Sequence, residues 1–196
     1  DKDINSTSYA FSISNDLSDF FSVNLGLSYL ERAPSAVELF MNGPHLATGR
    51  YEVGNTNLKA EESNNMDLTF SYENDGFFGS LTFFRNNIDN YIYLSDETEE
   101  EHEKHEEEEH HEDLILSNYL QKNAEMDGYE LEFGRTFGFY QGELLASFGM
   151  DSVSAEFSDG TDIPRIAPAR SIYRLTYTED DLKFLVSYKD VDGQDD

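Results

Sequence analysis

The sequence predicts an all-β protein, an antiparallel up-and-down meander of about eight strands from a transmembrane β-barrel. Apolar and aromatic residues alternate with polar ones along most of the 196 residues, and this period of two is that of a strand. The predicted connections are alternately short and long, as in barrels with short periplasmic turns and long extracellular loops. The polar positions are mostly Ser, Asn, Thr and Gly, which suit a wet lumen.

The first half of the chain contains four predicted strands. Tyr9, Phe11 and Ile13 share one parity, and the pattern resumes after a turn at Asn15–Asp19. An irregular segment follows, and then Asn74-Asp75-Gly76 marks a hairpin turn. The predicted strands cover residues 8–14, 21–29, 66–72 and 77–94, and the long irregular segment covers 31–63.

The second half repeats this scheme. A short connection is predicted at 135–140, a loop at 157–168 and a turn at Thr178–Asp181. The loop contains Asp159-Gly160-Thr161-Asp162, which we interpret as a turn and not as a calcium loop. The predicted strands cover residues 115–134, 144–150, 173–177 and 182–188.

The most unusual stretch is residues 96–113, which hold four of the five histidines together with twelve carboxylates and one lysine. So many unpaired charges cannot be buried, so the stretch is predicted to be a solvated extracellular loop, disordered without metal. Imidazole and carboxylate groups together bind zinc, copper and nickel. The candidate metal ligands in this stretch are His102, His105, His110, His111, Glu101, Glu109 and Glu112.

Two other interpretations of this stretch stay open. It is also compatible with a solvated acidic spacer that binds nothing, although a plain spacer has no need of imidazole. A charged helix with His102, His105 and Glu109 on one face is the third interpretation. Repulsion between the carboxylates disfavours that helix unless metal or low pH neutralises them.

Composition excludes several classes of function. The net charge of −28 excludes nucleic acid as a partner, because phosphate binding needs a basic surface. There is no cysteine and no apolar run long enough for a membrane-spanning helix. The sequence indicates no enzyme, because His102-Glu103-Lys104-His105 lacks the His-Glu-x-x-His spacing and no nucleophile system is evident.

Asp1-Lys2-Asp3 is expected to be a mature or cut end, since no signal peptide opens the chain.

Residues 31–63 resemble a known family. One run reads Arg32-Ala33-Pro34-Ser35-Ala36-Val37-Glu38-Leu39, and another reads Gly54-Asn55-Thr56-Asn57-Leu58-Lys59-Ala60-Glu61. Both are similar to motifs of the TonB-dependent receptors of Gram-negative outer membranes, where they occupy a long extracellular loop and the entry to the next strand. Ser63–Leu68 resembles the strand start that follows. Gly43-Pro44-His45-Leu46-Ala47-Thr48-Gly49, with the His/Glu-rich loop, resembles the zinc-receptor branch.

This resemblance implies an outer-membrane importer with zinc as cargo and no covalent cofactor. Residues 1–196 would be a partial barrel, because such receptors also have a plug domain, a TonB-box and a barrel of 22 strands. The implied partners are the TonB complex through the plug domain, outer-membrane lipid, and a metal ion or metal chelate. The alternatives are a receptor for a siderophore or another metal chelate, and a soluble surface β-domain with a solvated acidic loop.

His45 is the one histidine outside the acidic stretch, and we expect it to be a ligand in a tighter metal site. The alternative is a loop histidine that caps or packs beside Pro44. A zinc site needs three or four ligands, so His45 would need carboxylate partners. The possible partners in the same segment are Glu31, Glu38, Glu52, Glu61 and Glu62, and the sequence does not choose between them.

Overall fold

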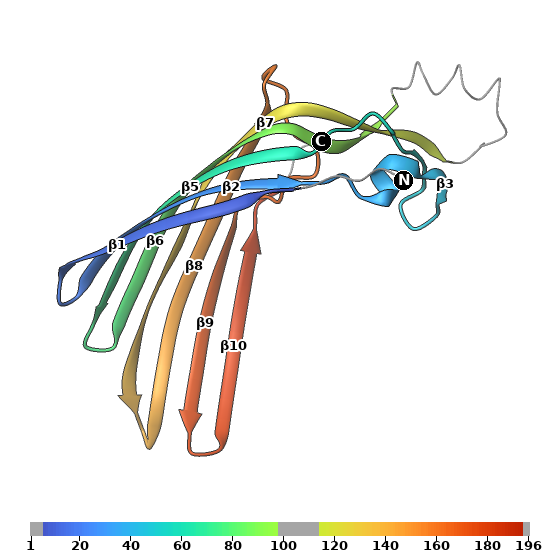
Figure 1. The fold of residues 1–196 in the computed structure, drawn as a ribbon. Coiled ribbons are helices and arrows are strands. Elements are labelled where there is room, and N and C mark those ends of the chain that lie inside the picture. The colour runs from blue at the N-terminus through green and yellow to red at the C-terminus, as the bar shows by residue number, and fades with distance from the viewer. Residues whose placement is uncertain (1–5, 98–113, 194–196) are drawn as a thin grey trace. The chain divides into compact units, whose positions relative to one another are not determined.

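The computed structural model describes residues 6–97 and 114–193. These residues contain one helix and ten strands (Figure 1). Eight of the strands are long, and two short ones lie in the segment between β2 and β5. The elements are β1 Ser8–Ser18, β2 Phe21–Arg32, α1 Ala36–Phe40, β3 Asn42–His45, β4 Arg50–Val53, β5 Glu61–Asn74, β6 Phe77–Asp96, β7 Ile115–Phe139, β8 Gly142–Phe157, β9 Arg170–Glu179 and β10 Leu182–Val191.

The predicted meander is confirmed. The eight long strands follow the order β1-β2-β5-β6-β7-β8-β9-β10, so each pairs with its neighbours in sequence among the long strands. The pairs β8–β9 and β9–β10 are antiparallel. β3 pairs with β4 in an antiparallel hairpin, and β4 pairs with β7 in parallel. No helix in the described part of the chain is long and apolar enough to cross a membrane.

The chain divides into two compact units, and each contains pieces from several strands. Unit 1 comprises residues 1–8, 30–63 and 88–124. Unit 2 comprises residues 9–29, 64–87 and 125–196. Unit 1 contains α1, β3 and β4, whereas unit 2 contains β8, β9 and β10.

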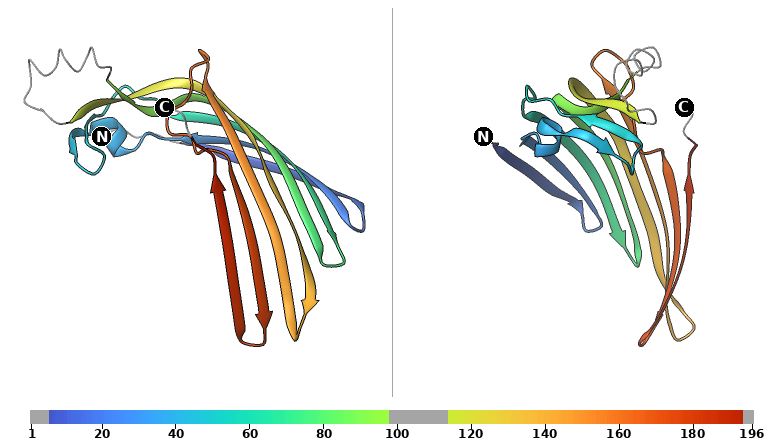
Figure 2. Two further views of the ribbon diagram at one scale, coloured as in Figure 1. Left: turned by 180° about the vertical axis from the view of Figure 1, so that it is seen from behind. Right: turned by 90° about the vertical axis from the view of Figure 1, so that its right-hand side faces the viewer.

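In unit 2, an aromatic row runs across β7, β8, β9 and β10. The ring centroids of Phe133 and Phe148 are 5.3 Å apart, and those of Phe148 and Tyr173 are 4.9 Å apart. Tyr173 and Tyr188 continue the row at 6.1 Å, and the strand register places them directly opposite each other. Cross-strand aromatic pairs stabilise a sheet. The predicted alternation therefore places aromatic side chains next to one another across these four strands. Figure 2 shows the paired strands β8, β9 and β10 from two further directions.

The hairpin turn between β5 and β6 has the predicted geometry. Asp75 and Gly76 both have positive φ, 49° and 73°, as a two-residue turn matched to strand twist requires. A Cβ on Gly76 would lie 2.5 Å from the carbonyl oxygen of Thr136, so only glycine fits. Two other turns are displaced from their predicted places. β1 runs to Ser18, and β7 runs to Phe139, with Tyr140 in the turn at φ 56°.

The segment 31–63 in unit 1 is more ordered than the irregular stretch that was expected. It contains α1, the β3–β4 hairpin and the start of β5. Leu39, Leu58 and Ile92 form a buried cluster there, and Tyr119 packs against it. The order comes from this small core and from the cap at the N-terminus of α1.

Candidate functional site

Arg32 ties the first sequence motif to the second one. Its Nη1 atom donates to both oxygens of Glu38 at 3.0 Å, and its Nε atom donates to Glu61. Glu61 is 7% exposed, and its second oxygen accepts from the backbone N–H of Ile92 at 2.6 Å. Both carboxylates are therefore held by bonds to charged or backbone donors, which are stronger than neutral side-chain bonds.

The same motif builds the N-terminus of α1. The Ser35 hydroxyl accepts from the Glu38 N–H at 3.2 Å, and Glu38 accepts from the Ser35 N–H at 2.6 Å. This reciprocal pair is a capping box. Burial alone would raise the pKa of Glu38, but the hydrogen bonds from Arg32 and Ser35 outweigh it and lower that pKa below its usual value.

The second motif packs directly on the first. The Gly54 N–H donates to the carbonyl of Met41 at 2.7 Å, and the Asn55 N–H donates to the carbonyl of Glu38 at 2.8 Å. A Cβ on Gly54 would lie 2.7 Å from backbone atoms of residues 39–41, so glycine is required for this approach. The two motifs therefore form one structural frame, in which Glu38 and Glu61 both accept hydrogen bonds from Arg32.

His45 lies at the end of β3, in the hairpin beside this frame. Its Nδ1 atom is 2.7 Å from Oε1 of Glu52. The other oxygen of Glu52 accepts from the hydroxyl of Tyr119 at 3.0 Å. Glu52 is 4% exposed, whereas half of the His45 side chain is exposed. Of the five carboxylates considered from sequence, the structure brings Glu52 to His45.

Arg50 holds the residue at which the His/Glu-rich stretch begins. Its Nε and Nη2 atoms donate to the two oxygens of Asp96 at 2.8 and 2.7 Å. The buried hydroxyl of Ser117 donates to Asp96 at 2.8 Å. On the other side of the stretch, the Ile115 N–H donates to the carbonyl of Gly49 at 3.0 Å. Both flanks of residues 98–113 are thus bonded to the turn and second strand of the β3–β4 hairpin.

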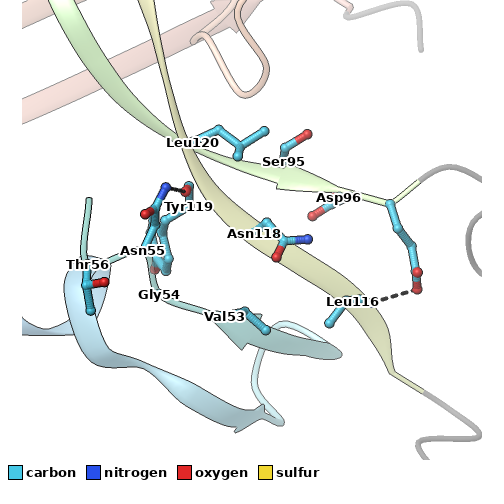
Figure 3. Close-up of a pocket in the computed structure, with 11 residues that line it drawn as sticks. Val53, Gly54, Asn55, Thr56, Ser95, Asp96, Leu116, Asn118, Tyr119 and Leu120 are labelled. Atoms are coloured by element: carbon cyan, nitrogen blue, oxygen red, sulfur yellow. Dashed lines mark hydrogen bonds between the residues drawn. The ribbon is translucent and has the colours of Figure 1, made fainter. Parts of the chain in front are cut away.

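A pocket of about 440 Å³ lies in unit 1 between the end of β6, the start of β7 and residues 53–56 (Figure 3). Asn55 on one wall donates to the carbonyl of Tyr119 at 3.4 Å. On another wall, the Leu116 N–H donates to Glu97 at 2.9 Å. The volume is within the usual range for small-molecule pockets. The lining residues are Val53, Gly54, Asn55, Thr56, Ser95, Asp96, Glu97, Leu116, Asn118, Tyr119 and Leu120.

Most of the ligands proposed from sequence belong to the part of the chain that the structure does not describe. His102, His105, His110, His111, Glu101, Glu109 and Glu112 lie outside the described residues. Within residues 6–97 and 114–193, no cluster of three or more metal-ligating side chains is present. Among the candidate metal ligands and their possible carboxylate partners, the structure thus brings together His45 and Glu52.

A family model described as "TonB dependent receptor-like, beta-barrel" matches residues 1–196. The chain belongs to this family. TonB-dependent receptors are outer-membrane β-barrel proteins that act as receptors and transporters, and they are not enzymes. The resemblance found from the two sequence motifs is therefore confirmed at the level of the family.

Two relatives of the TonB-dependent chain are receptors for iron chelates. The ferrienterobactin receptor of Escherichia coli K12 is 34% identical over 97 residues, which are 45% of this chain and 13% of that protein. The ferric enterobactin receptor PirA of Pseudomonas aeruginosa is 36% identical over 90 residues, which are 40% of this chain and 12% of that protein. The chain thus spans a small part of these relatives. Neither name supports the zinc-receptor branch that was expected.

Solved structures confirm the fold of the TonB-dependent chain. The copper transporter OprC matches with a TM-score of 0.68 and 20% identity over 92% of this chain and 25% of that chain. A ferric enterobactin receptor PfeA from Pseudomonas aeruginosa matches with a TM-score of 0.60 and 21% identity over 93% of this chain and 27% of that chain.

Sequence reasoning missed three residues of this site. Tyr119, Arg50 and Ser117 each bond to a carboxylate that lies in a different element. The parallel pairing of β4 with β7 brings them into place, and no local pattern predicts that pairing. The capping box at Ser35 and Glu38, in contrast, is a local signal that would have identified α1.

Proposed function

We propose that the chain is part of the barrel of an outer-membrane receptor that takes up a metal chelate. The chelate class that we propose is the ferric siderophores. The observation that carries this proposal is the 34% and 36% identity to two enterobactin receptors. This favours the metal-chelate alternative over the zinc interpretation. In this proposal the TonB complex acts through a plug domain elsewhere in the protein, and outer-membrane lipid contacts the aromatic row.

The geometry of unit 1 supports a role in binding at the extracellular side. The motif frame fixes α1 and the residues from 54 to 58, and the pocket of about 440 Å³ opens beside them. Its walls carry amide and hydroxyl groups from Asn55, Asn118 and Ser95, together with the carboxylates of Asp96 and Glu97. Such convergent polar groups around a partly apolar pocket are typical of small-molecule sites. We propose that this pocket contacts part of the chelate.

A second candidate cargo is a free metal ion, with zinc as the leading choice. The observation that favours it is the His/Glu-rich stretch 96–113, with four histidines among twelve carboxylates. The acidic field of the chain, at a net charge of −28, raises the local concentration of cations. In this picture the stretch captures the ion weakly, and His45 helps to hold it.

Uptake by the receptor that contains this chain distinguishes the two cargoes. Cells with and without the receptor are grown under iron limitation with ferric enterobactin, and separately under zinc limitation. The proposed function predicts a growth defect in the first condition, together with loss of ⁵⁵Fe uptake from the chelate. A defect confined to zinc limitation would contradict it and favour the second cargo.

A further inference from the structure

Glu52 is a buried carboxylate, and each of its two oxygens lies within hydrogen-bond distance of a side chain from another part of the chain. Oε1 faces Nδ1 of His45 at 2.7 Å, and Oε2 accepts from the Tyr119 hydroxyl at 3.0 Å. The side chain of Glu52 is 6% exposed, whereas that of His45 is 50% exposed. The three residues thus form a chain of contacts from the wall of the pocket, where Tyr119 lies, to the exposed imidazole.

This arrangement determines which nitrogen of His45 carries the proton in the neutral ring. An ionised carboxylate can only accept hydrogen bonds, so Nδ1 must be the donor to Glu52. The neutral ring then has its lone pair on Nε2. Among the described residues, Nε2 of His45 has no hydrogen-bond partner, so this lone pair is available to solvent or cargo.

The burial of Glu52 makes this orientation costly to lose. A buried carboxylate needs its hydrogen bonds, because an unsatisfied buried charge costs several kcal/mol. The parallel pairing of Glu52 with Ser117 fixes its backbone in the sheet, and the pairing of His45 with Arg50 fixes the histidine in the hairpin. Both partners are therefore held on paired strands, which makes the ring orientation rigid.

We propose that Glu52, whose second oxygen accepts from the Tyr119 hydroxyl, is a positioning residue for His45, and that it presents Nε2 of His45 as an electron-pair donor to a borderline metal ion. Carboxylate–histidine pairs orient imidazole ligands in this way at metal sites. The inference rests on the second candidate cargo of the proposed function, a free or weakly chelated metal ion, since it assigns one contact for that ion. The ion could arrive hydrated or in a chelate with an open coordination position, and the same nitrogen would bind both.

The test uses the receptor that contains this chain, with ¹⁵N-labelled histidine and His45→Ala for assignment. In the unsubstituted receptor, the ¹⁵N spectrum of neutral His45 is expected to show a protonated Nδ1 and an unprotonated Nε2. The opposite tautomer would overturn the inference without any further variant. Hydrated Zn²⁺ and Zn²⁺ held by nitrilotriacetate are then added separately, and the Nε2 signal should shift with one or both probes. No shift with either probe would overturn it.

The Glu52→Gln variant sharpens the test. Tyr119 continues to donate to the side-chain oxygen, so the amide NH₂ faces His45 and donates to Nδ1. The proton then moves to Nε2, which can no longer donate its electron pair. The affinity for zinc, measured from the titration of the His45 ¹⁵N signal, should therefore fall at least tenfold. Tyr119→Phe keeps the carboxylate and should retain the tautomer. Glu73→Gln, an exposed position in unit 2 with the same change in charge, is the matched control and should change nothing.

An unchanged tautomer and zinc response in Glu52→Gln would overturn the positioning role. Uptake of ferric enterobactin is measured in parallel to separate this result from the proposed function. Normal uptake without the tautomer effect overturns this inference alone. The tautomer and zinc effects without uptake of the chelate uphold the inference and overturn the proposed function alone.

Discussion

Arg32 donates a hydrogen bond to Glu61, a residue 29 positions further along the chain. This bond joins the two sequence motifs that identify the family, and Leu39 and Leu58 from the same two motifs belong to one buried cluster. The motif residues thus have a structural reason to occur together. They hold the segment between β2 and β5 in place, and the residues available to cargo lie beside them.

Arg32→Ala should destabilise this frame. The substitution leaves the buried Glu61 with the backbone N–H of Ile92 as its hydrogen-bond donor and removes both bonds to Glu38. The two carboxylates are largely buried, whereas the Arg32 side chain is 42% exposed, so we expect a cost of about 1–3 kcal/mol, below that of a fully buried pair. Hydrogen exchange at the Leu39 and Ile92 amides, converted to a free energy of local opening, measures the effect.

Arg85→Ala is the matched control. Arg85 also pairs with a carboxylate, Glu125, but both side chains are about half exposed. Exposed ion pairs contribute little to stability because solvent screens them, so the stability of unit 2 should hardly change. Equal losses in Arg32→Ala and Arg85→Ala would contradict the structural role of the motif arginine.

Gly54→Ala adds a single methyl group, but it should lower the stability of the fold substantially. The new Cβ would lie 2.7 Å from three backbone atoms of residues 39–41, and backbone cannot move aside as a flexible side chain can. We expect a cost of about 1–3 kcal/mol from this overpacking. Gly43→Ala, with no atom within 4 Å of its new Cβ, should be close to neutral. The two variants are compared by denaturant unfolding in detergent, and equal midpoints would contradict the prediction.

The strands were predictable because their signals are local. Alternation of apolar and polar residues survives along each long strand, and Asn74-Asp75-Gly76 encodes its turn by the residues it contains. The segment 31–63 was not predictable in the same way. Its helix has five residues and its two short strands have four each, which is too short for a period to emerge.

The candidate site was predicted less completely than the fold. His45 could be singled out as the histidine outside the acidic stretch. Its partner could not be chosen, because Glu52 is placed beside Tyr119 by the parallel register of β4 and β7. Such a register depends on pairing between segments that are distant in the sequence. It therefore cannot be predicted from composition or from the spacing of residues. The His/Glu-rich ligands stay a prediction.

The frame should loosen in acid. The bonds from Arg32 and Ser35 lower the pKa of Glu38, so its ionised form stabilises the folded segment. That contribution is complete at neutral pH, declines as pH falls below the usual carboxyl value of about 4.3, and is lost once pH passes the lower folded value. Hydrogen exchange at the Leu39 and Met41 amides, corrected for intrinsic rates, should show this decline. Glu38→Gln should abolish it, and an unaltered pH dependence would contradict the assignment.

Deleting residues 98–113 should remove weak zinc binding and spare the sheet. The deletion keeps Asp96 and Glu97, which bond to Arg50 and Leu116, and a short Gly/Ser linker joins Glu97 to residue 114. Calorimetry should then show fewer weak zinc sites, and the circular dichroism signal should be unchanged. In the intact receptor, binding should weaken below about pH 6.5, because protonated imidazole is no ligand. Equal zinc uptake by both forms would contradict metal capture by the stretch.

The parallel pairing of β4 with β7 also sets an order of events during folding. β4 cannot complete its ladder until β7 is in place, and the bond between Tyr119 and Glu52 spans 67 positions of the chain. Closing so long a loop lowers the conformational entropy of the chain before any stabilising contact has formed. Contacts between residues far apart in the sequence therefore form slowly. The β9–β10 hairpin needs only a tight turn. In a refolding time course, its amides should gain protection early, whereas those of Arg50–Val53 should gain it last.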